Sequence, residues 1–557
     1  MNRAVSSSLL ALIILAIVAS VSAEKPSQDH IRNIQTMAIK NKKSPVAHWG
    51  FDPQNYTQWS NHSLRLIPVY TFGTKGKGKG INLGSYKGKN SPYRDKKSLE
   101  TIYGFVPENT LNPKAKYLDQ TNLYDIQQAA LAAGKKNIIL FVFDGMDWQT
   151  TKAATLYYTG EDKYKSGRGT GLHFQDYRAD GTSQFGFMST APHNAGTNVD
   201  VNQQTVINPG GIKRGGYNAA KGGATPWTAG DDKKYLIGST KNDYGEHAYP
   251  DSANTATSMT AGIKSYNSAI NVDHTGARVT TIAHQAQEKG YAIGVVSSVP
   301  FTHATPAAAY AHNVSRNDYQ DLARDLLGQS SISHPENPLA GMDVVLGGGF
   351  GTIEKPTGAK SHGDNFVPGW KYISEETIKK ADVKNGGKYS VAMRTPKLKG
   401  SAGLNQATEN AVQNKTRLLG VYGVGQYAAH LPYQTANGDY QPAPGLKNSA
   451  ELYSKSDLEE NPTLSDMTGS ALQVLGQNKN GFWLLVEAGD VDWANHDNNL
   501  DNSIGAVKSG DAAFKVITDW VEKNSNWNET VVILTADHGH YLNIDQPQAL
   551  IPPKEKK

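Results

Sequence analysis

The chain has 557 residues, of which 38% are hydrophobic, so it is long enough to bury a large core. Its formal net charge is +5, or +4 without residues 1–23, whose only charge is Arg3. It has no cysteine, which excludes disulfide bonds as a source of stability. The 55 glycines indicate many loops around one large domain, and the sequence contains neither an internal repeat nor a long low-complexity tract.

Residues 1–23 are typical of a secretory signal peptide. Arg3 precedes an apolar stretch from Leu9 to Val21, and Ser22 and Ala23 offer small residues for cleavage. The stretch is too short to span a bilayer comfortably. We therefore expect a periplasmic or secreted (extracellular) protein, without a membrane span once the signal is removed.

Residues 24–135 are interpreted as an N-terminal extension that is rich in lysine and glycine in part. The lysines interleaved with glycines from Lys75 to Lys97 are more typical of a solvated, flexible loop than of a polyanion site. We expect no nucleic-acid recognition.

Apolar runs at 138–143, 292–296, 344–346, 484–486 and 531–534 alternate with alanine-rich helical segments. This alternation predicts an α/β fold with a doubly wound, mostly parallel central sheet flanked by helices, with loop insertions. The main domain is expected at 136–545, followed by a tail at 546–557. An insertion at about 160–246 is longer than a compact domain needs, and we interpret it as a lid or rim.

Three of these runs end in residue types that bind metal ions. Asp144 follows the run at 138–143. Glu487, Asp492 and His496 follow the run at 484–486, and Asp537, His538 and His540 follow the run at 531–534. Ligands bind at the carboxyl ends of strands in open parallel sheets, so the three ends are expected to converge. Taken singly, a strand-end Asp is usually a turn former. Together with the imidazoles, these acids favour a metal centre.

The ligand types indicate which ions would bind. Asp492 and His496 are four residues apart, which places both on one face of a helix, and a carboxylate with an imidazole suits Zn²⁺. Asp144 and Glu487 are hard oxygen ligands and favour Mg²⁺.

Asp251-Ser252-Ala253 stands at the start of a small-residue helix. A serine hydroxyl is a poor nucleophile unless a base, a cation or a helix N-terminus stabilises the alkoxide. No Gly-x-Ser-x-Gly motif surrounds Ser252, which argues against an esterase triad. An isolated Asp-Ser pair is usually a helix cap. Beside a metal centre, Ser252 becomes a candidate metal-activated nucleophile.

Eight motifs follow one another between about Lys136 and His540. They are Phe143-Asp144-Gly145-Met146, Asp251-Ser252-Ala253, the segment Ala261 to Asn267, His303 to Ala308, Ala311 to Arg316, Asp343 to Gly349, Val486-Glu487 with Asp492 and His496, and Thr535 to His540. In this order they resemble the alkaline phosphatase family. The resemblance implies that 136–545 is the catalytic domain.

The resemblance also implies two zinc ions and one magnesium ion. The ligands of one zinc would be Asp144, Ser252, Asp537 and His538. The other zinc would be held by Asp492 and His496. Asp144 would also reach the magnesium, whose further ligands would be Thr305 and Glu487, with His303 nearby.

Further residues would handle the substrate. Arg316 would grip two phosphate oxygens with its planar fork of donors. His540 would orient a zinc carboxylate such as Asp492, and Trp493 would form a wall of the phosphate pocket. Taken singly, Thr305 is typical of a helix cap, Arg316 of a surface ion pair and His303 of a loop histidine.

The implied reaction is hydrolysis of phosphate monoesters through a phosphoserine on Ser252. Such a site grips only the phosphoryl group, so small monoesters with widely varying leaving groups are the expected substrates. Because several ligands must lose protons to bind metal, activity is expected to fall in acid. A homodimer is left open.

Other functions were weighed against this one. A sulfatase would need a C/S-x-P-x-R motif, whereas Ser252 is followed by Ala-Asn-Thr. A phosphodiesterase of the same superfamily could use the same zinc ions, but Arg316 favours a dianionic monoester. A phosphate-binding protein whose catalysis has decayed is the alternative from a different class.

One ligand is missing from the expected pattern. Relatives complete the zinc held by Asp492 and His496 with a third histidine well downstream of the Asp-His-Gly-His segment, and no histidine follows His540 here. Either the sequence is truncated, or the site has low affinity and the protein is weakly active or inactive, or another histidine substitutes. We expect any substitute to come from residues 160–250, with His247 and His193 as tentative ligands.

Overall fold

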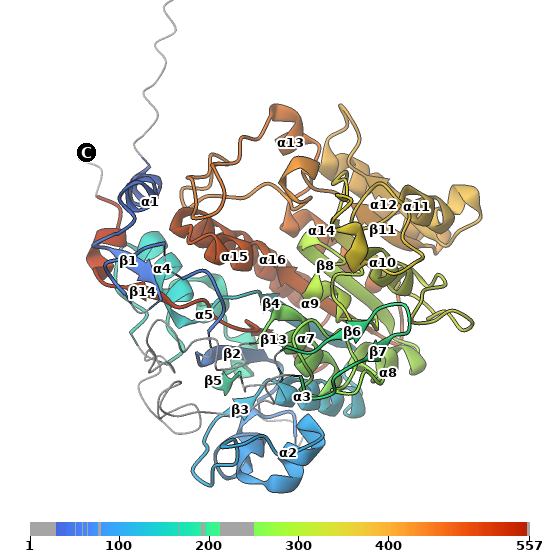
Figure 1. Ribbon diagram of the computed structural model, residues 1–557, viewed down its shortest axis with the longest axis horizontal. Coiled ribbons are helices and arrows are strands. Elements are labelled where there is room, and N and C mark those ends of the chain that lie inside the picture. Colours follow the sequence, from blue (N-terminus) through green and yellow to red (C-terminus); the bar gives the residue numbers. More distant parts are fainter. Residues whose placement is uncertain are drawn as a thin grey trace, which may run out of the picture.

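The computed structural model describes residues 29–553, except 51, 58, 64, 76–79, 166, 191–193, 195 and 212–249. A ten-stranded sheet lies at its centre (Figure 1). In spatial order the strands are β10 (Tyr389–Met393), β11 (Arg417–Val421), β9 (Val344–Gly348), β8 (Ala292–Pro300), β12 (Phe482–Ala488), β4 (Asn137–Phe143), β13 (Thr530–Thr535), β2 (Ile67–Phe72), β5 (Gln184–Ser189) and β3 (Leu118–Asp119). Only β2 runs antiparallel to its two neighbours. The predicted α/β fold with a mostly parallel sheet is confirmed.

Helices cover both faces of this sheet. Phe482 packs against Trp520 of α16, whereas the next residue, Trp483, donates a hydrogen bond to Gln127 of α3 on the opposite face. The helices are α1 (His30–Asn41), α2 (Lys96–Tyr103), α3 (Thr121–Ala132), α4 (Trp148–Thr159), α5 (His173–Asp176), α7 (Ser252–Ala261), α8 (Ile282–Glu288), α9 (Ala304–Ala307), α10 (Tyr319–Leu327), α11 (Glu375–Ala381), α12 (Gly400–Asn414), α13 (Lys455–Glu459), α14 (Leu464–Leu475), α15 (Asp490–His496) and α16 (Leu500–Asn524).

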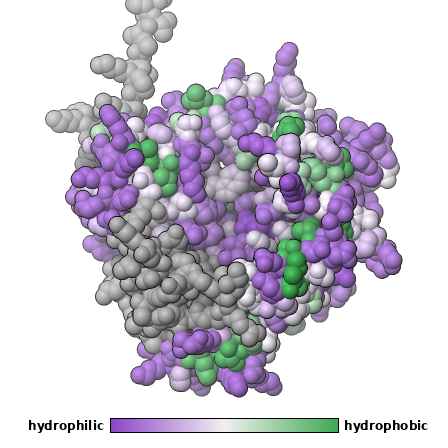
Figure 2. All heavy atoms as spheres, viewed as in Figure 1, coloured by the Kyte–Doolittle hydropathy of each residue, from purple (hydrophilic) through white to green (hydrophobic). Residues whose placement is uncertain are grey.

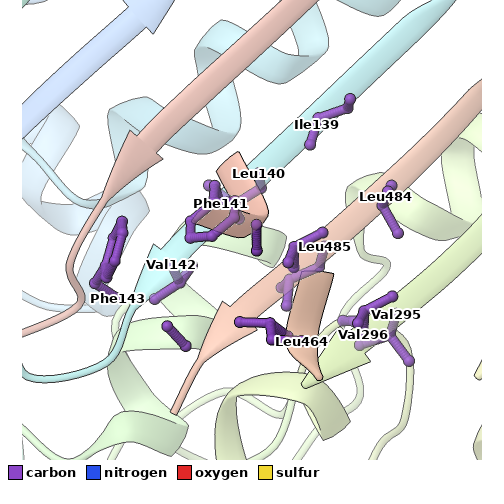
Figure 3. Close-up of a cluster of buried hydrophobic side chains, with 14 of the residues drawn as sticks. Ile139, Leu140, Phe141, Val142, Phe143, Val295, Val296, Leu464, Leu484 and Leu485 are labelled. Carbon is purple, nitrogen blue, oxygen red and sulfur yellow. The ribbon is translucent and has the colours of Figure 1, made fainter. Parts of the chain in front are cut away.

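The core lies on the central strands. Every residue of β4, β8 and β12 is buried. A parallel strand buried on both faces shows a continuous apolar run instead of an alternating one, which is the pattern read from the sequence. Figure 3 shows the side chains of β4, β8 and β12 packed together with Leu464 of α14. This core fixes the level at which the central strands end.

The N-terminal segment is built into the same core. Strand β2 lies between β13 and β5, and β3 closes that edge of the sheet. A separate pair joins β1 (Ala47–Trp49) to β14 (Leu542–Ile544). The ring of His30 also contacts the Ala549 carbonyl oxygen at 2.7 Å. Residues 24–135, expected as an extension, therefore contribute strands to the central sheet, and α1 contacts α16.

Several predicted segments lie partly or wholly outside the described residues. They are the signal peptide at 1–23, most of the second half of the 160–246 insertion, and the end of the tail at 546–557. The described part of the insertion includes β5 of the central sheet and the short pair β6 (Val199–Asp200) and β7 (Thr205–Val206). Among the described helices, none is long and apolar enough to cross a membrane. On the face seen in Figure 2 the surface is mostly hydrophilic, with small separate hydrophobic patches.

Candidate metal centre

The ends of three neighbouring strands bring the predicted ligands together. The register aligns the last residues of β12, β4 and β13. Asp144 follows β4 directly, Glu487 lies at the end of β12, and Asp537 comes just after β13. All three carboxylates are fully buried. The carboxyl ends of these strands thus bring three buried carboxyl groups together.

The first ligand group consists of Asp492, His496 and His62. Helix α15 carries Asp492 and His496 on one face, as their spacing predicted, and His496 Nε2 lies 3.5 Å from Asp492 Oδ1. His62 Nε2 lies 3.6 Å from the same oxygen and 2.9 Å from His496 Nε2. Ligands bound to a tetrahedral zinc at about 2.0 Å are about 3.3 Å apart. The three atoms already have this spacing.

The hydrogen bonds of the two imidazoles leave their lone pairs facing each other. His62 Nδ1 lies 2.5 Å from the Pro250 carbonyl oxygen, and His496 Nδ1 lies 2.8 Å from that of Ser60. A carbonyl oxygen can only accept a hydrogen bond, so in both imidazoles Nδ1 carries the proton. The Nε2 atom of each ring therefore has a free lone pair. Burial lowers the pKa of His62, and it lowers that of His496 to about 4, so no proton is held between them at neutral pH. A divalent cation fits between these atoms.

His62 is a candidate for the third ligand that the sequence interpretation did not include. The described imidazole that reaches both Asp492 and His496 comes from the N-terminal segment and not from residues 160–250. The backbone fixes it there, because the Ser63 N–H donates to the Gly539 carbonyl oxygen at 2.7 Å. The tentative ligands His247 and His193 lie outside the described residues.

His540 supports the first group from behind. Its Nε2 lies 2.6 Å from Asp492 Oδ1 and donates to that carboxylate. Gly145 makes the close packing possible: its φ is +71°, and a Cβ there would lie 2.6 Å from the His540 ring. Burial raises the pKa of Asp492, but the neighbouring imidazoles of His496 and His540 outweigh it and hold the pKa well below its usual range.

The second ligand group surrounds Ser252, the first residue of α7. His538 Nε2 lies 3.2 Å from Asp144 Oδ1 and 3.5 Å from Asp537 Oδ2. The Ser252 hydroxyl lies 3.4 Å from Asp144 Oδ1 and 3.3 Å from His538 Nε2. A Thr255 hydroxyl and the Gly145 N–H hold the Asp537 carboxylate in place. Two carboxylates, one imidazole and one hydroxyl again have the spacing of zinc ligands.

A third group offers oxygen atoms only. The Thr305 hydroxyl lies 3.4 Å from Asp144 Oδ2, and the buried Glu487 carboxylate accepts a hydrogen bond from Ser297. Burial raises the pKa of Glu487 to about 8 and that of Asp537 to about 7, with repulsion between the carboxylates adding to both. Carboxyl groups with such raised pKa values would need a bound cation to stabilise their charged form. Because this group offers only oxygen atoms, it suits Mg²⁺.

Arg316, His303 and Trp493 lie at the open side of the centre. Arg316 Nη1 bonds Asp251 Oδ2 at 3.0 Å, and its Nη2 lies 3.2 Å from His303 Nε2. His303 packs edge-on against Trp493. Burial, with the charge of Arg316, lowers the pKa of His303 to about 3, so this imidazole is neutral. His303 therefore faces the guanidinium in the described contacts.

A cavity of about 580 Å³ opens over these groups. Ser252 and Arg316 line it together with ligands of the first group, and Trp493 and residues 426–451 form its outer wall. The candidate nucleophile, the candidate metal ligands of the first group and the Arg316 guanidinium thus all line the same cavity.

A doubly wound sheet with two imidazole–carboxylate groups around a buried serine defines an α/β protein with a candidate site for more than one metal ion. A sequence model described as alkaline phosphatase matches residues 216–550. Alkaline phosphatase 3 of Bacillus subtilis is 31% identical over 307 residues, covering 55% of this chain and 53% of that protein. Alkaline phosphatase of Escherichia coli K12 is 31% identical over 320 residues, covering 54% of this chain and 60% of that protein.

The chain belongs to the alkaline phosphatase family. It spans about half the length of the curated relatives it matches. The crystal structure of a cold-active alkaline phosphatase from Shewanella sp. is similar over 72% of this chain and 68% of that one, with 22% identity and a TM-score of 0.42.

Proposed function

We propose that this protein is a phosphate monoester hydrolase that acts through a phosphoserine on Ser252. The observation that supports this most directly is the Ser252 hydroxyl, 3.3 Å from His538 Nε2 and 3.4 Å from Asp144 Oδ1, on a cavity that Arg316 also lines. The proposed nucleophile thus lies next to the proposed cation ligands, as phosphoryl transfer requires.

The ligand groups suit two zinc ions and one magnesium ion. The first zinc would be held by His62, Asp492 and His496. The second would be held by Asp144, Ser252, Asp537 and His538. The magnesium would be held by Asp144, Thr305 and Glu487, and His303 lies outside this set in the described contacts. When bound, such ions lower the pKa of a hydroxyl or a water and neutralise charge on phosphoryl oxygens.

The protein's own residues position the substrate. Ser252 Oγ attacks phosphorus and forms the phosphoserine ester as the alcohol leaves, and water then hydrolyses that ester. Arg316 binds non-bridging oxygens with its free donors, and Asp251 holds the guanidinium in place. The edge of Trp493 closes the side of the pocket near His303.

The substrate class follows from this division of work. Every charged group near Ser252 addresses the phosphoryl group, so we propose small monoesters with varied leaving groups as substrates, and no nucleic-acid recognition. We also propose secretion or periplasmic export through the segment at 1–23, and a homodimer as the assembly to test by ultracentrifugation.

A phosphodiesterase is the second candidate, because it would use the same ligand groups. Arg316 favours a monoester, because the monoester dianion carries one more negative charge than a diester for the guanidinium to neutralise. Turnover of an aryl phosphate monoester should exceed that of the matching diester and the matching sulfate. A preference for the diester would replace the proposal. Binding of phosphate without turnover of any of the three would assign a phosphate-binding role.

Replacing Arg316 with alanine should raise KM and weaken inhibition by phosphate, with a smaller loss of turnover than at Ser252. The reason is that Arg316 contacts oxygens present in both the bound substrate and the transition state. Steady-state kinetics with phosphate as inhibitor would measure this. Arg316→Lys, which keeps the charge but loses the planar fork, should be intermediate. Unchanged phosphate inhibition in both variants would remove Arg316 from the site.

The metal-free protein should lose stability as the pH rises from about 6.5 to about 8. Below this window the buried histidines, whose pKa values are lowered from 6.5, make stability rise with pH and oppose the effect. The unfolded chain releases the protons of Glu487 and Asp537 near 4.5 and 3.8, whereas the folded chain keeps them up to about 8 and 7. The folded state binds more protons in this window, so the free energy of unfolding falls with rising pH and levels off above it.

Metal binding reverses this trend, because it needs the same carboxylates deprotonated. The difference in Tm between protein in zinc and magnesium and protein in chelator should widen up to about pH 8. A Tm difference that stays constant across the window would show that these carboxylates do not bind the ions.

A further inference from the structure

A second group of potential metal ligands lies outside the cavity of Ser252. It consists of His312, in the loop after α9, Asp325, in α10, and His334, in the loop after α10. The ligand atoms of the three residues all lie within 4.8 Å of one another. None of them lines the cavity or contacts the ligand groups described above.

The distances within this group are those of a tetrahedral site. His312 Nδ1 lies 3.1 Å from His334 Nε2, and His334 Nε2 lies 3.8 Å from Asp325 Oδ2. These values bracket the separation of about 3.3 Å between ligands of one zinc ion. Asp325 is fully buried and His312 nearly so, whereas the His334 side chain remains 11% exposed, which leaves a route for an ion.

The surrounding hydrogen bonds orient the ligands. The His312 ring bonds the Val279 carbonyl oxygen through Nε2 at 2.8 Å, so Nε2 carries the proton and Nδ1 presents its lone pair to the group. The Ser331 hydroxyl donates to Asp325 Oδ1 at 2.6 Å, and the second oxygen, Oδ2, faces the imidazoles. Such partners typically fix metal ligands in place.

Both imidazoles are neutral, as coordination requires. Burial, with the charge of Arg278, lowers the pKa of His334 to about 4, and burial lowers that of His312 well below its usual range. His284 stacks on His312 with ring centroids 5.1 Å apart, and its buried Nε2 has no hydrogen-bond partner. Neutral imidazoles beside a buried carboxylate are the donor set that zinc prefers.

Arg278 stabilises the metal-free arrangement. Its Nη1 lies 3.1 Å from His334 Nδ1, so it donates there, and His334 Nε2–H donates in turn to His312 Nδ1. Coordination would require the His334 Nε2 proton to be lost and Nδ1 to take one up, with Arg278 turning away. Arg278 is exposed and also bonds the Ser333 carbonyl oxygen, so it has both room and an alternative partner.

We propose that His312, Asp325 and His334 bind a zinc ion that is separate from the catalytic metal centre, with water as the fourth ligand. The ion would tie α10 to the loop that runs from His312 to Arg316. Its role is to hold the segment that carries Arg316, and it takes no part in the chemistry. This inference does not depend on the proposed reaction.

Zinc bound per chain, measured by elemental analysis after equilibration with zinc and removal of free metal, tests the proposal. His334→Ala and Asp325→Asn should each bind about one zinc ion less than the wild type, because each removes one of three ligands. His274→Ala, a partly buried histidine on a neighbouring loop, should bind as much zinc as the wild type. Equal zinc content in the wild type and both ligand variants would overturn the proposal.

Thermal unfolding in chelator separates metal loss from misfolding. His334 lies in a loop with its side chain partly exposed, so His334→Ala, which loses the hydrogen bonds to Arg278 and His312, should still fold, with a slightly lower Tm than the wild type when no metal is present. Added zinc should then raise the Tm of the wild type more than that of the variant. If His334→Ala does not fold, His334→Gln keeps the side-chain size and is judged by the same zinc count. An equal zinc-induced shift in the wild type and the folded variant would also overturn the proposal.

Discussion

Replacement of Ser252 with alanine is expected to remove nearly all phosphomonoesterase activity. The change deletes one hydroxyl and leaves the neighbouring Asp144, Asp537 and His538 ligands intact. Loss of a nucleophile typically costs about 10⁴-fold or more in turnover, which corresponds to about 5.5 kcal/mol of transition-state stabilisation. Hydrolysis of an aryl phosphate by the purified variant would measure this.

Ser258→Ala provides the matched control. Ser258 lies on the same helix, is equally buried, and donates only to the Asn254 carbonyl oxygen. It should retain activity and fold, while Ser252→Ala should keep the wild-type Tm and metal content. More than about a hundredth of wild-type activity in Ser252→Ala would assign the nucleophile to another residue.

The second large effect is expected at His62. Its replacement with alanine leaves Asp492 and His496 as the protein ligands of the first group, and two ligands bind zinc weakly. Removal of a residue that only hydrogen-bonds to a zinc ligand typically lowers metal affinity or activity about 10–100-fold. We therefore expect loss of the ligand itself to lower zinc affinity and turnover about a hundredfold or more. Added zinc should restore part of the activity.

His48→Ala is the control for this variant. His48 belongs to the same N-terminal segment, is buried, and bonds Asp545 at 2.7 Å, away from the cavity. Its loss should affect Tm more than turnover. If His62→Ala kept full zinc content and activity, the third ligand would have to come from elsewhere, with His247 and His193 the first residues to test.

The sequence predicted which candidate ligands come together at the ends of parallel strands. Asp144, Glu487 and Asp537 each come at the end of a continuous apolar run, and parallel neighbours in register end at one edge of the sheet. The helical spacing of Asp492 and His496 is visible in the same way. These residues could be found because the end of an apolar run in the sequence corresponds directly to the carboxyl end of a strand in the sheet.

His62 could not be found by that rule. Strand β2 runs antiparallel to its neighbour β13, so β2 begins where β13 ends, and the candidate ligand precedes the strand instead of following it. Pro68 within the strand weakens the strand signal further, because proline lacks a backbone N–H and is rare inside a sheet. A histidine shortly before an apolar run was the available signal.

Side-chain partnerships are the other feature that the sequence does not specify. His303 was expected near the magnesium ligands, and its described contacts are with Arg316 and Trp493. Which of several nearby groups an imidazole faces depends on rotamers and packing across elements that are far apart in the sequence. The role of His303 stays a prediction.

The pairing of β1 with β14 makes the polypeptide nearly a closed ring. The two paired strands lie close to opposite ends of the described chain, and His30 and Ala549 extend their contact. A chain joined at that place and reopened at Gly134, which has open space around it between α3 and β4, would keep the same spatial neighbours. In that circularly permuted protein His62 would follow His540, which is the order that the resemblance implied. The metal centre would then depend on which strands are neighbours in the folded protein, and not on their order in the sequence.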